Sequence, residues 1–345
     1  MPTLEDTMYF LPGYRRMTDN ISAMDFASEA DQSLKTFRVN KAWRDTRGAG
    51  VKVAVLDTGC DLNHPDLEGQ VIAAQDFTGS RYGPEDVQGH GSHCAGTIGA
   101  KENDAGTIGV MPDIAKEGGG LIIAKVLGDN GSGRGDWIAR GLQWAAEQGA
   151  DIISMSLGSP VNIPGLQQVI RSITNSGKWV ICAAGNSGKR GSRSTVNFPG
   201  ALPETLAVGA VGNDKVITDF SSRGPAVDVC APGENILSTY PNGNYARLSG
   251  TSMACPFVAG VMGLSWAVGN GGVINAPKDL RDFVRAHSED AGNPGEDNDY
   301  GAGLIIPETI AVGEDDPSPD PEPGNGEYVY LKFPKVDVLG SLPGN

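Results

Sequence analysis

The chain has 345 residues, 39% of them hydrophobic, a composition typical of a globular protein with a sizeable core. Lys and Arg number 27 against 42 Asp and Glu, and the resulting formal charge of −15 argues against nucleic acid and anionic membranes as partners. The sequence contains no run of about 18 consecutive apolar residues, so a transmembrane helix is not expected.

The N-terminal segment and the cysteines both bear on the compartment in which the protein works. Residues 1–25 lack the basic start and continuous apolar core of a secretory signal, and we expect them to form a separate arm. The cysteines are odd in number and mostly lie in apolar or small-residue runs, which predicts buried free thiols in a reducing compartment. They are Cys60, Cys94, Cys182, Cys230 and Cys255. Both observations favour the cytoplasm.

Short apolar strands alternate with helical segments from about residue 50 onward. The predicted strands are residues 51–57, 121–127, 151–157 and 179–185. They are bounded by glycine or polar residues, as expected for parallel strands buried on both faces. Residues 134–150 and 164–177 read as helices, the first with Ile138, Leu142, Ala145 and Gly149 on one face. This order predicts an α/β fold with a mostly parallel, doubly wound central sheet and helices on both faces.

Composition divides the chain into four parts. After the arm of residues 1–25, a single catalytic domain is expected to cover residues 26–312. Residues 313–327 are acidic and rich in Pro, which predicts an extended linker. Residues 328–345 alternate apolar and polar residues, a pattern typical of an edge strand.

Polar side chains occur where the predicted elements begin or end. Asp57 ends the first strand, and His90 stands between two glycines before a small-residue helix. Asn186 follows the strand at 179–185, and Ser252 precedes an apolar helix. Taken singly, each has an ordinary explanation as a turn residue, a cap or a buried histidine. Together they follow the chain order Asp–His–Ser of one serine hydrolase class, at the strand ends where α/β proteins gather their chemistry.

These residue types fit nucleophilic catalysis. A serine hydroxyl needs a histidine to take its proton and an acid to hold that histidine in the right tautomer. The oxyanion that forms needs fixed donors, which the Asn186 amide and the Ser252 N–H at a helix start can supply. We expect Ser252 to be exposed at the mouth of its helix. We expect Pro256 near the first turn, where a missing N–H costs least.

The stretches that carry these residues resemble blocks of the subtilisin-like serine proteases. In the family's order over residues 40–312 they are VAVLDTGCDLNHPDL, GHGSHCAGTI, SMSLGS, AAGNSG, FSSRGPAVDVCAPG and LSGTSMACPFVAG. The resemblance implies a serine endopeptidase that forms an acyl-enzyme intermediate. It implies Asp57 as orienting acid, His90 as general base and Ser252 as nucleophile, with Asn186 as oxyanion donor.

Within the family, the chain is most similar to the intracellular subtilisins, through VKVAVLDTGCD, KVLGDNGSG, DIISMSLGSP and APGENILST. Those enzymes carry a short N-terminal arm that blocks the active site until it is clipped. Their blocking motif is a Leu–Ile–Pro–Tyr-like element, and residues 9–14, YFLPGY, are similar but depart from it at Gly13. An N-terminus without this role is the alternative. The resemblance also suggests a homodimer.

The resemblance further implies where protein and peptide substrates bind. A substrate is expected to add as a strand along the edges at Gly128–Gly133 and Ser156–Gly158. The residues implied are Gly128, Gly131, Gly133, Ser156, Leu157, Gly158, Ala183, Ala184, Gly185 and Asn197. Small uncharged walls predict a roomy primary pocket and broad cleavage after large apolar or aromatic residues.

A structural Ca²⁺ site is also implied by the resemblance. The side chains of Asp66 and Asn103 match its side-chain ligands, and the carbonyls of Lys101, Ala105 and Thr107 match its backbone ligands. Hard oxygen ligands from a bent loop suit Ca²⁺. The alternative is that Asp66 only caps a turn.

Two other functions remain open at this stage. One is a catalytically silent fold kept as a binding or regulatory module, although no triad member is missing. The other makes Cys255 a thiol nucleophile, but it would lie about one helical turn deeper than Ser252. The leading prediction is an active endopeptidase.

Overall fold

The computed structural model describes residues 3–5, 7–13, 15–16, 29–30, 32–189, 191, 193–269 and 277–310. Residues 17–25 of the predicted arm, the predicted linker at 313–327 and the predicted edge strand at 328–345 lie outside the described residues. In the part of the chain that is described, we find no helix with the length and apolar character needed to cross a membrane.

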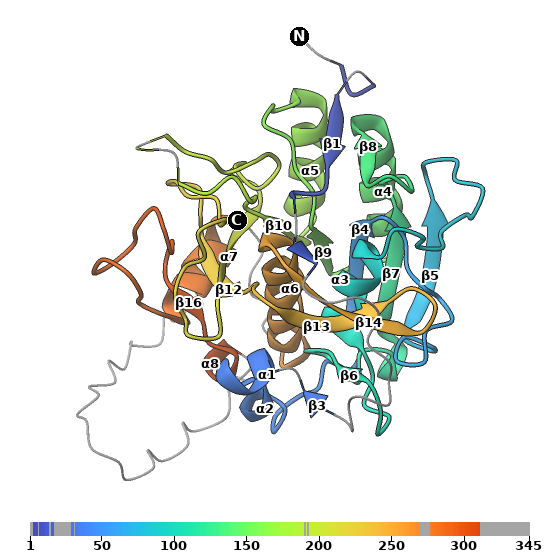
Figure 1. Ribbon diagram of the computed structural model, residues 1–345. Helices are drawn as coiled ribbons and strands as arrows, with labels where there is room; N and C mark the ends of the chain where they lie inside the picture. Colours follow the sequence, from blue (N-terminus) through green and yellow to red (C-terminus); the bar gives the residue numbers. More distant parts are fainter. Residues whose placement is uncertain are drawn as a thin grey trace, which may run out of the picture. The chain divides into compact units, whose positions relative to one another are not determined.

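A nine-stranded sheet forms the centre of the domain (Figure 1). In spatial order its strands are β15 (Ser288–Glu289), β16 (Leu304–Ile305), β12 (Val229–Pro232), β11 (Leu206–Val211), β10 (Trp179–Ala183), β9 (Ile152–Met155), β4 (Lys52–Asp57), β7 (Gly120–Lys125) and β5 (Val71–Asp76). All neighbouring strands run parallel except the pair β15 and β16. The predicted fold class is therefore confirmed.

Helices cover both faces of the sheet because the central strand β4 is apolar on both sides. Val53 and Val55 pack in the apolar cluster that contains α3 (His90–Gly99) and α6 (Thr251–Ala267). Ala54 and Leu56 point the opposite way, into the cluster that contains α4 (Gly135–Glu147) and α5 (Pro164–Asn175). This alternation follows from the two-residue period of a strand.

Smaller sheets and helices complete the described chain. The strand pairs are β1 (Met8–Phe10) with β8 (Ser132–Arg134), β13 (Ile236–Tyr240) with β14 (Asn244–Ser249), β14 with β2 (Arg15–Arg16), and β3 (Glu29–Ala30) with β6 (Thr107–Ile108). The remaining α-helices of the described chain are α1 (Gln32–Thr36), α2 (Val39–Ala42), α7 (Pro277–Ala286) and α8 (Pro307–Ile310), and a short 3₁₀ helix, η2, covers Lys116–Gly118.

The helix predicted at 134–150 forms, with Ile138, Leu142 and Ala145 buried as expected. The prediction was wrong for Gly149, which lies beyond the end of the helix. Its φ of +84° is the left-handed conformation in which helices commonly end, and which glycine adopts without a steric penalty.

Candidate active site

The predicted polar residues gather at the carboxyl edge of the parallel sheet. Asp57 is the last residue of β4, Ser156–Gly158 follows β9, and Gly185 and Asn186 follow β10. Helices α3 and α6 pack on one face of these strands and begin with His90 and Thr251 (Figure 1). Strand ends and helix starts therefore meet in one region, as they do in other open α/β sheets.

Asp57 and His90 form a buried hydrogen-bonded pair. The ring Nδ1 of His90 lies 2.8 Å from Asp57 Oδ1, and both side chains are at most 1% exposed. The backbone N–H of Thr58 donates to the same carboxylate oxygen at 2.7 Å. Because the carboxylate accepts the Nδ1 proton, the other ring nitrogen, Nε2, carries the lone pair that a general base needs.

Three side chains fix the start of α3 and hence the position of His90. The first backbone N–H groups of the helix, on His90, Gly91 and Ser92, have no partner inside it. They donate to Gln88 Oε1 at 2.9 Å, Thr58 Oγ1 at 2.9 Å and Asp86 Oδ2 at 2.8 Å. The role of Asp86 is not predicted from the sequence, because Asp86 stands three residues before the N-cap residue, Gly89, where no local capping signal is expected.

Ser252 lies in the first turn of α6, as predicted, but it is fully buried. Its hydroxyl donates to the Ser156 carbonyl at 3.4 Å. The expectation of an exposed serine is therefore wrong for this structure. The described N-terminal residues run along the same edge, and the carbonyl of Gly13 reaches Asn186 beside the helix start.

Pro256 lies in the second turn of α6, so the expectation that it falls near the first turn is wrong. The residue four positions before it is Ser252, whose carbonyl would otherwise accept the missing N–H. That carbonyl instead accepts the Ser156 hydroxyl at 2.9 Å and the Cys94 thiol at 3.5 Å. Cys94 Sγ also lies 3.8 Å from His90 Nδ1, so one thiol contacts both His90 and Ser252.

The orientation of the Asn186 amide is fixed by Thr251. Both the backbone N–H and the hydroxyl of Thr251 donate to Asn186 Oδ1, at 2.9 and 3.0 Å. The NH₂ group must therefore face the other way, and it donates to the Gly13 carbonyl at 2.8 Å. A peptide carbonyl is thus already held by the amide predicted to stabilise an oxyanion.

Residues 8–13 occupy the edges expected to bind substrate. Strand β1 pairs antiparallel with β8, and Phe10 and Gly158 exchange backbone hydrogen bonds of 3.1 and 3.0 Å. Leu11 N–H donates to the Gly131 carbonyl at 3.2 Å. The Tyr9 side chain is 1% exposed, and burial raises its pKa, so it binds as a neutral, largely apolar ring.

The predicted pocket walls lie around Asn197. A Cβ on Gly158 would come within 2.9 Å of Asn197 Cβ, and a Cβ on Gly185 within 2.8 Å of its Nδ2, so larger wall residues would not fit. The Asn197 N–H donates to the Ala184 carbonyl at 2.9 Å.

Ala183 is buried in the core beside this wall, and Leu157 is fully buried in the apolar cluster that includes Tyr9. The remaining edge residue, Gly128, donates to the Ser132 carbonyl at 2.8 Å, which closes the β8 turn.

Asp66 is a fully buried carboxylate that no cation is seen to pair with among the described residues. Asn103 Nδ2 and the Thr107 N–H donate to its two oxygens at 3.0 Å each. The Tyr245 hydroxyl also bonds to it; burial and then the Asp66 charge raise the pKa of that phenol. The Thr107 hydroxyl is buried without a hydrogen bond in the described chain. Asp66 is thus a buried carboxylate whose charge no cationic side chain of the described chain neutralises, and it lies near a hydroxyl oxygen without a hydrogen bond. Such a site suits a hard cation.

The five cysteines are free and buried, as predicted. Burial raises the pKa of Cys255 to about 11, and its thiol lies against Ser154 and the Ile181 carbonyl inside the core. A thiolate is the reactive form of cysteine, so this environment disfavours Cys255 as a nucleophile.

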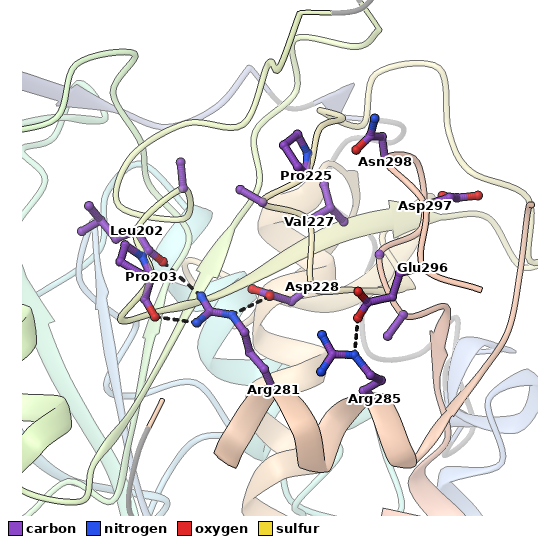
Figure 2. Close-up of a pocket in the computed structure, with 14 residues that line it drawn as sticks. Leu202, Pro203, Pro225, Val227, Asp228, Arg281, Arg285, Glu296, Asp297 and Asn298 are labelled. Atoms are coloured by element: carbon purple, nitrogen blue, oxygen red, sulfur yellow. Dashed lines mark hydrogen bonds and ion pairs between the residues drawn. The ribbon is translucent and has the colours of Figure 1, made fainter. Parts of the chain in front are cut away.

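A cavity of about 520 Å³ lies elsewhere, between α7 and the loops around Pro203 and Pro225 (Figure 2). None of the candidate catalytic residues lines it. Its wall contains Arg281, which bonds Asp228 Oδ1 at 2.7 Å and the Leu202 carbonyl at 3.1 Å, and also the carbonyls of Pro203 and Thr205. The guanidinium donors are therefore used in joining α7 to these loops.

Comparisons of the sequence with known proteins show which proteins this chain is similar to. A family model described as the subtilase family matches residues 48–303. The intracellular serine protease of Paenibacillus polymyxa is 46% identical over 242 residues, which are 69% of this chain and 73% of that protein. The major intracellular serine protease of Bacillus subtilis (strain 168) is 43% identical over 252 residues, 71% and 77% of the two chains. Thermitase of Thermoactinomyces vulgaris is 42% identical over 225 residues, 65% and 77%.

Proposed function

The chain belongs to the subtilase family and is a subtilisin-type serine endopeptidase, and on this premise we propose that Asp57, His90 and Ser252 carry the reaction. The observation that best supports this assignment is the Asn186 amide, which holds the Gly13 carbonyl at 2.8 Å in the region of the Asp57–His90 pair.

In the proposed mechanism, Ser252 Oγ attacks the scissile carbonyl while His90 Nε2 takes its proton. Asp57 keeps the ring in the required tautomer and stabilises the imidazolium that forms. Asn186 donates to the oxyanion, the carbon–nitrogen bond breaks, and the proton passes from His90 to the leaving amine. Water then hydrolyses the acyl-enzyme by the same groups. The Ser252 hydroxyl must turn from the Ser156 carbonyl towards His90, and catalytic hydrogen bonds commonly tighten only when substrate binds.

A fluorophosphonate probe tests the assignment. We expect covalent labelling of Ser252 in protein lacking residues 1–16, and none in the Ser252→Ala variant. Removing the nucleophile of another subtilisin lowers turnover about 10⁶-fold, and a loss of this order is expected here. Absence of labelling in the arm-deleted, Ca²⁺-replete protein would support the silent binding module instead.

The N-terminal arm is proposed to inhibit the enzyme. Its strand pairs with β8 and exchanges hydrogen bonds with Gly158, on the two edges proposed to bind substrate, and Gly13 bonds to Asn186. These contacts support competition with substrate. Deleting residues 1–16 is expected to raise peptidase activity at least tenfold. Equal activity in the full-length and deleted proteins, with the arm still intact by mass spectrometry, would reject this role.

The proposed specificity is broad, with a preference for large apolar or aromatic residues before the cleaved bond. The proposed substrate-binding cleft is the region between the edges Gly128–Gly133 and Ser156–Gly158. The uncharged walls around Asn197 and the burial of Tyr9 support an apolar cleft. Mass spectrometry of peptides released from a denatured protein mixture would measure the preference. Predominant cleavage after basic residues would contradict it.

A structural Ca²⁺ is proposed at Asp66, held with Asn103 and the carbonyls of Lys101, Ala105 and Thr107. The cation would neutralise the buried carboxylate and tie the 101–107 loop to it. Rotating the Asn103 amide would turn its oxygen towards Asp66, where its nitrogen now lies at 3.0 Å.

Cytoplasmic location and a homodimer are further proposals. The free buried thiols and the names of the two intracellular relatives support the first. Light scattering of the purified protein would test the second, and a monomer at micromolar concentration would reject it. Substrates are proposed to be proteins and peptides, and nucleic acids and membranes are not expected to bind this acidic chain.

A further inference from the structure

The N-terminal arm continues beyond the cleft and caps helix α4. The Gly135 N–H donates to the Thr7 carbonyl at 3.0 Å, and the Asp136 N–H donates to the Leu4 carbonyl at 3.2 Å. Arg134, the N-cap residue of α4, makes no side-chain capping bond. The arm backbone therefore supplies acceptors that a helix start otherwise takes from its own cap residue.

The Leu4 side chain lies where two helices begin with little side-chain bulk. A Cβ added to Gly135 would come within 2.7 Å of the Leu4 carbonyl oxygen and 3.4 Å of its Cδ2. A Cβ added to Gly165, in the first turn of α5, would come within 3.2 Å of Leu4 Cδ1. Leu4 is half-buried and packs on the apolar cluster that contains α4 and α5. The glycines leave the space that this branched side chain fills.

Other contacts make the segment a folded unit rather than a loose end. The Thr7 side chain is 8% exposed, and its hydroxyl donates to the Thr3 carbonyl at 3.2 Å. The turn leads directly into strand β1, which enters the cleft. Polypeptide that fills the cleft edges is therefore continuous with polypeptide on α4.

We propose that the start of α4, with Gly135 and Gly165, is an exosite for polypeptide, and that its occupant is residues 3–7 of this chain. The exosite recognises a polypeptide with an aliphatic side chain five positions before the residue that pairs with Gly133. In this chain these residues are Leu4 and Tyr9. The backbone carbonyls of the same polypeptide cap α4. This inference rests on the proposed inhibitory function of the arm. Residues 3–7, which bind the exosite, and residues 8–13, which bind the cleft, are one continuous polypeptide. Binding of either segment therefore raises the local concentration of the other at its own site.

The exosite changes what activation requires. Hydrolysis of the arm after Gly13 would leave the α4 contacts and the cleft strand on one fragment. That fragment would stay bound and inhibit until it dissociates. Activity is therefore expected to lag behind cleavage, and the lag to shorten when the exosite is weakened.

Peptides added to enzyme that has removed its own arm provide the test. The probes are residues 3–13, residues 8–13, and residues 3–13 with Leu4→Asp, each as an inhibitor of a short chromogenic peptide. Residues 3–13 are expected to bind at least about tenfold more tightly than residues 8–13, because they also bury an aliphatic side chain. The Leu4→Asp peptide should lose this advantage.

Two enzyme variants locate the effect. Gly135→Ala places a Cβ against the Leu4 carbonyl. The inhibition constant of residues 8–13 divided by that of residues 3–13 should therefore fall to about one. Gln143→Ala, exposed on the same helix, is the matched control and should keep the ratio.

The outcomes separate the two proposals. Inhibition by both peptides with a ratio near one in the unchanged enzyme would overturn the exosite and leave the inhibitory cleft strand standing. A ratio that persists in Gly135→Ala would also overturn the exosite. Failure of every peptide to inhibit would overturn the inhibitory arm itself.

Discussion

Pro256 lies four residues after Ser252 in α6, and its missing N–H leaves the Ser252 carbonyl outside the helical hydrogen-bond ladder. That carbonyl is bound by the Ser156 hydroxyl, which follows β9, and by the Cys94 thiol of α3. The backbone of the proposed nucleophile is therefore fixed by two other elements. An interior proline, ordinarily a defect in a helix, here releases an acceptor for tertiary contacts.

Pro256→Ala tests this relationship. The new N–H would compete for the Ser252 carbonyl, so turnover is expected to fall several-fold while KM changes little. Stability should change little, because one new hydrogen bond, worth about 1 kcal/mol, offsets the loss of buried methylene groups at about 0.8 kcal/mol each. Kinetics and thermal unfolding measure the two effects. Pro164→Ala, at the first position of α5, is the control, and equal turnover in the two variants would contradict the prediction.

Asn186→Ala should act on both catalysis and inhibition. In arm-deleted protein, turnover is expected to fall about 10²–10³-fold, the magnitude known for removing the oxyanion-hole amide of another subtilisin. In full-length protein the arm should also bind less tightly, because the hydrogen bond from the Asn186 side chain to the Gly13 carbonyl is lost. Thr251→Val, which removes one of the two donors that orient the amide, should give a smaller loss, and Thr251→Ser almost none. Identical turnover for Thr251→Val and Thr251→Ser would show that the hydroxyl does not orient Asn186.

Removal of Ca²⁺ should destabilise the protein through Asp66. At a free Ca²⁺ concentration about 100 times the Kd, binding adds about 2.7 kcal/mol to the free energy of unfolding. A chelator is therefore expected to lower Tm by roughly 5 °C. Asp66→Asn removes the buried charge, so its Tm should respond little to Ca²⁺ or chelator. Asp104→Asn, in the same loop but not a proposed ligand, should respond like the unchanged protein. A chelator without effect on the unchanged protein would reject the site.

The sequence predicted the elements that carry the site, because their local patterns are strong. The strand ending at Asp57 is a short apolar run, and the helices beginning near His90 and Ser252 are runs of small or apolar residues, so the kind of element is clear even where its first residue is not. Asn186 was found for the same reason, since it follows a predicted strand. In an α/β sheet, residues at the carboxyl ends of the strands and at the starts of the following helices lie on the same edge. Their proximity therefore follows from the order of the predicted elements.

Features that depend on distant pairing could not be predicted in detail. The family resemblance suggested a blocking arm, but its register requires Phe10 to pair with Gly158, and no local pattern encodes that partner. The contact between Leu4 and α4 is of the same kind. Strand β5 was missed because its alternation is weak, with most residues only partly buried. The position of Pro256 was misjudged because the helix start, at Thr251, lies earlier than the sequence alone reveals.

Arg281 is expected to be needed for stability because it pairs with the mostly buried Asp228 (Figure 2). Burial raises the pKa of Asp228, and Arg281 counteracts that rise. Arg281→Met would leave the carboxylate without its cation, which typically costs about 3–5 kcal/mol. The folded-state pKa of Asp228 would rise further, so the loss should be largest at neutral pH and smaller at acid pH, where the group is protonated. Urea unfolding at both pH values measures this.

The double variant Arg281→Met/Asp228→Asn provides the control for that loss. Removing the charge should recover a substantial part of the stability at neutral pH, because no ionised group is then buried unpaired. A double variant no more stable than Arg281→Met would mean that the carbonyl contacts of Arg281, not its charge, account for the loss.

Glu308 should contribute to stability only above the acid range. It joins α8 to α2, with its two oxygens 2.6 Å from Arg38 and 2.9 Å from Lys41. Burial raises the pKa of Glu308, but the bonds and charges of Arg38 and Lys41 outweigh it, so the net pKa lies below the ordinary value of 4.5. A carboxyl with a lowered folded-state pKa stabilises the fold above its unfolded pKa, and this contribution disappears as pH falls through the folded value.

Glu308→Gln is therefore expected to be less stable than the unchanged protein at pH 7, by less than about 1 kcal/mol because both cations are half exposed. The two proteins should converge as pH falls below 4.5. Urea unfolding across this range measures the difference. Glu147→Gln, at an exposed acid for which the described chain has no ion pair, should follow the unchanged protein at every pH. A stability difference for Glu308→Gln that stays constant into strong acid would mean that shape, not charge, accounts for it.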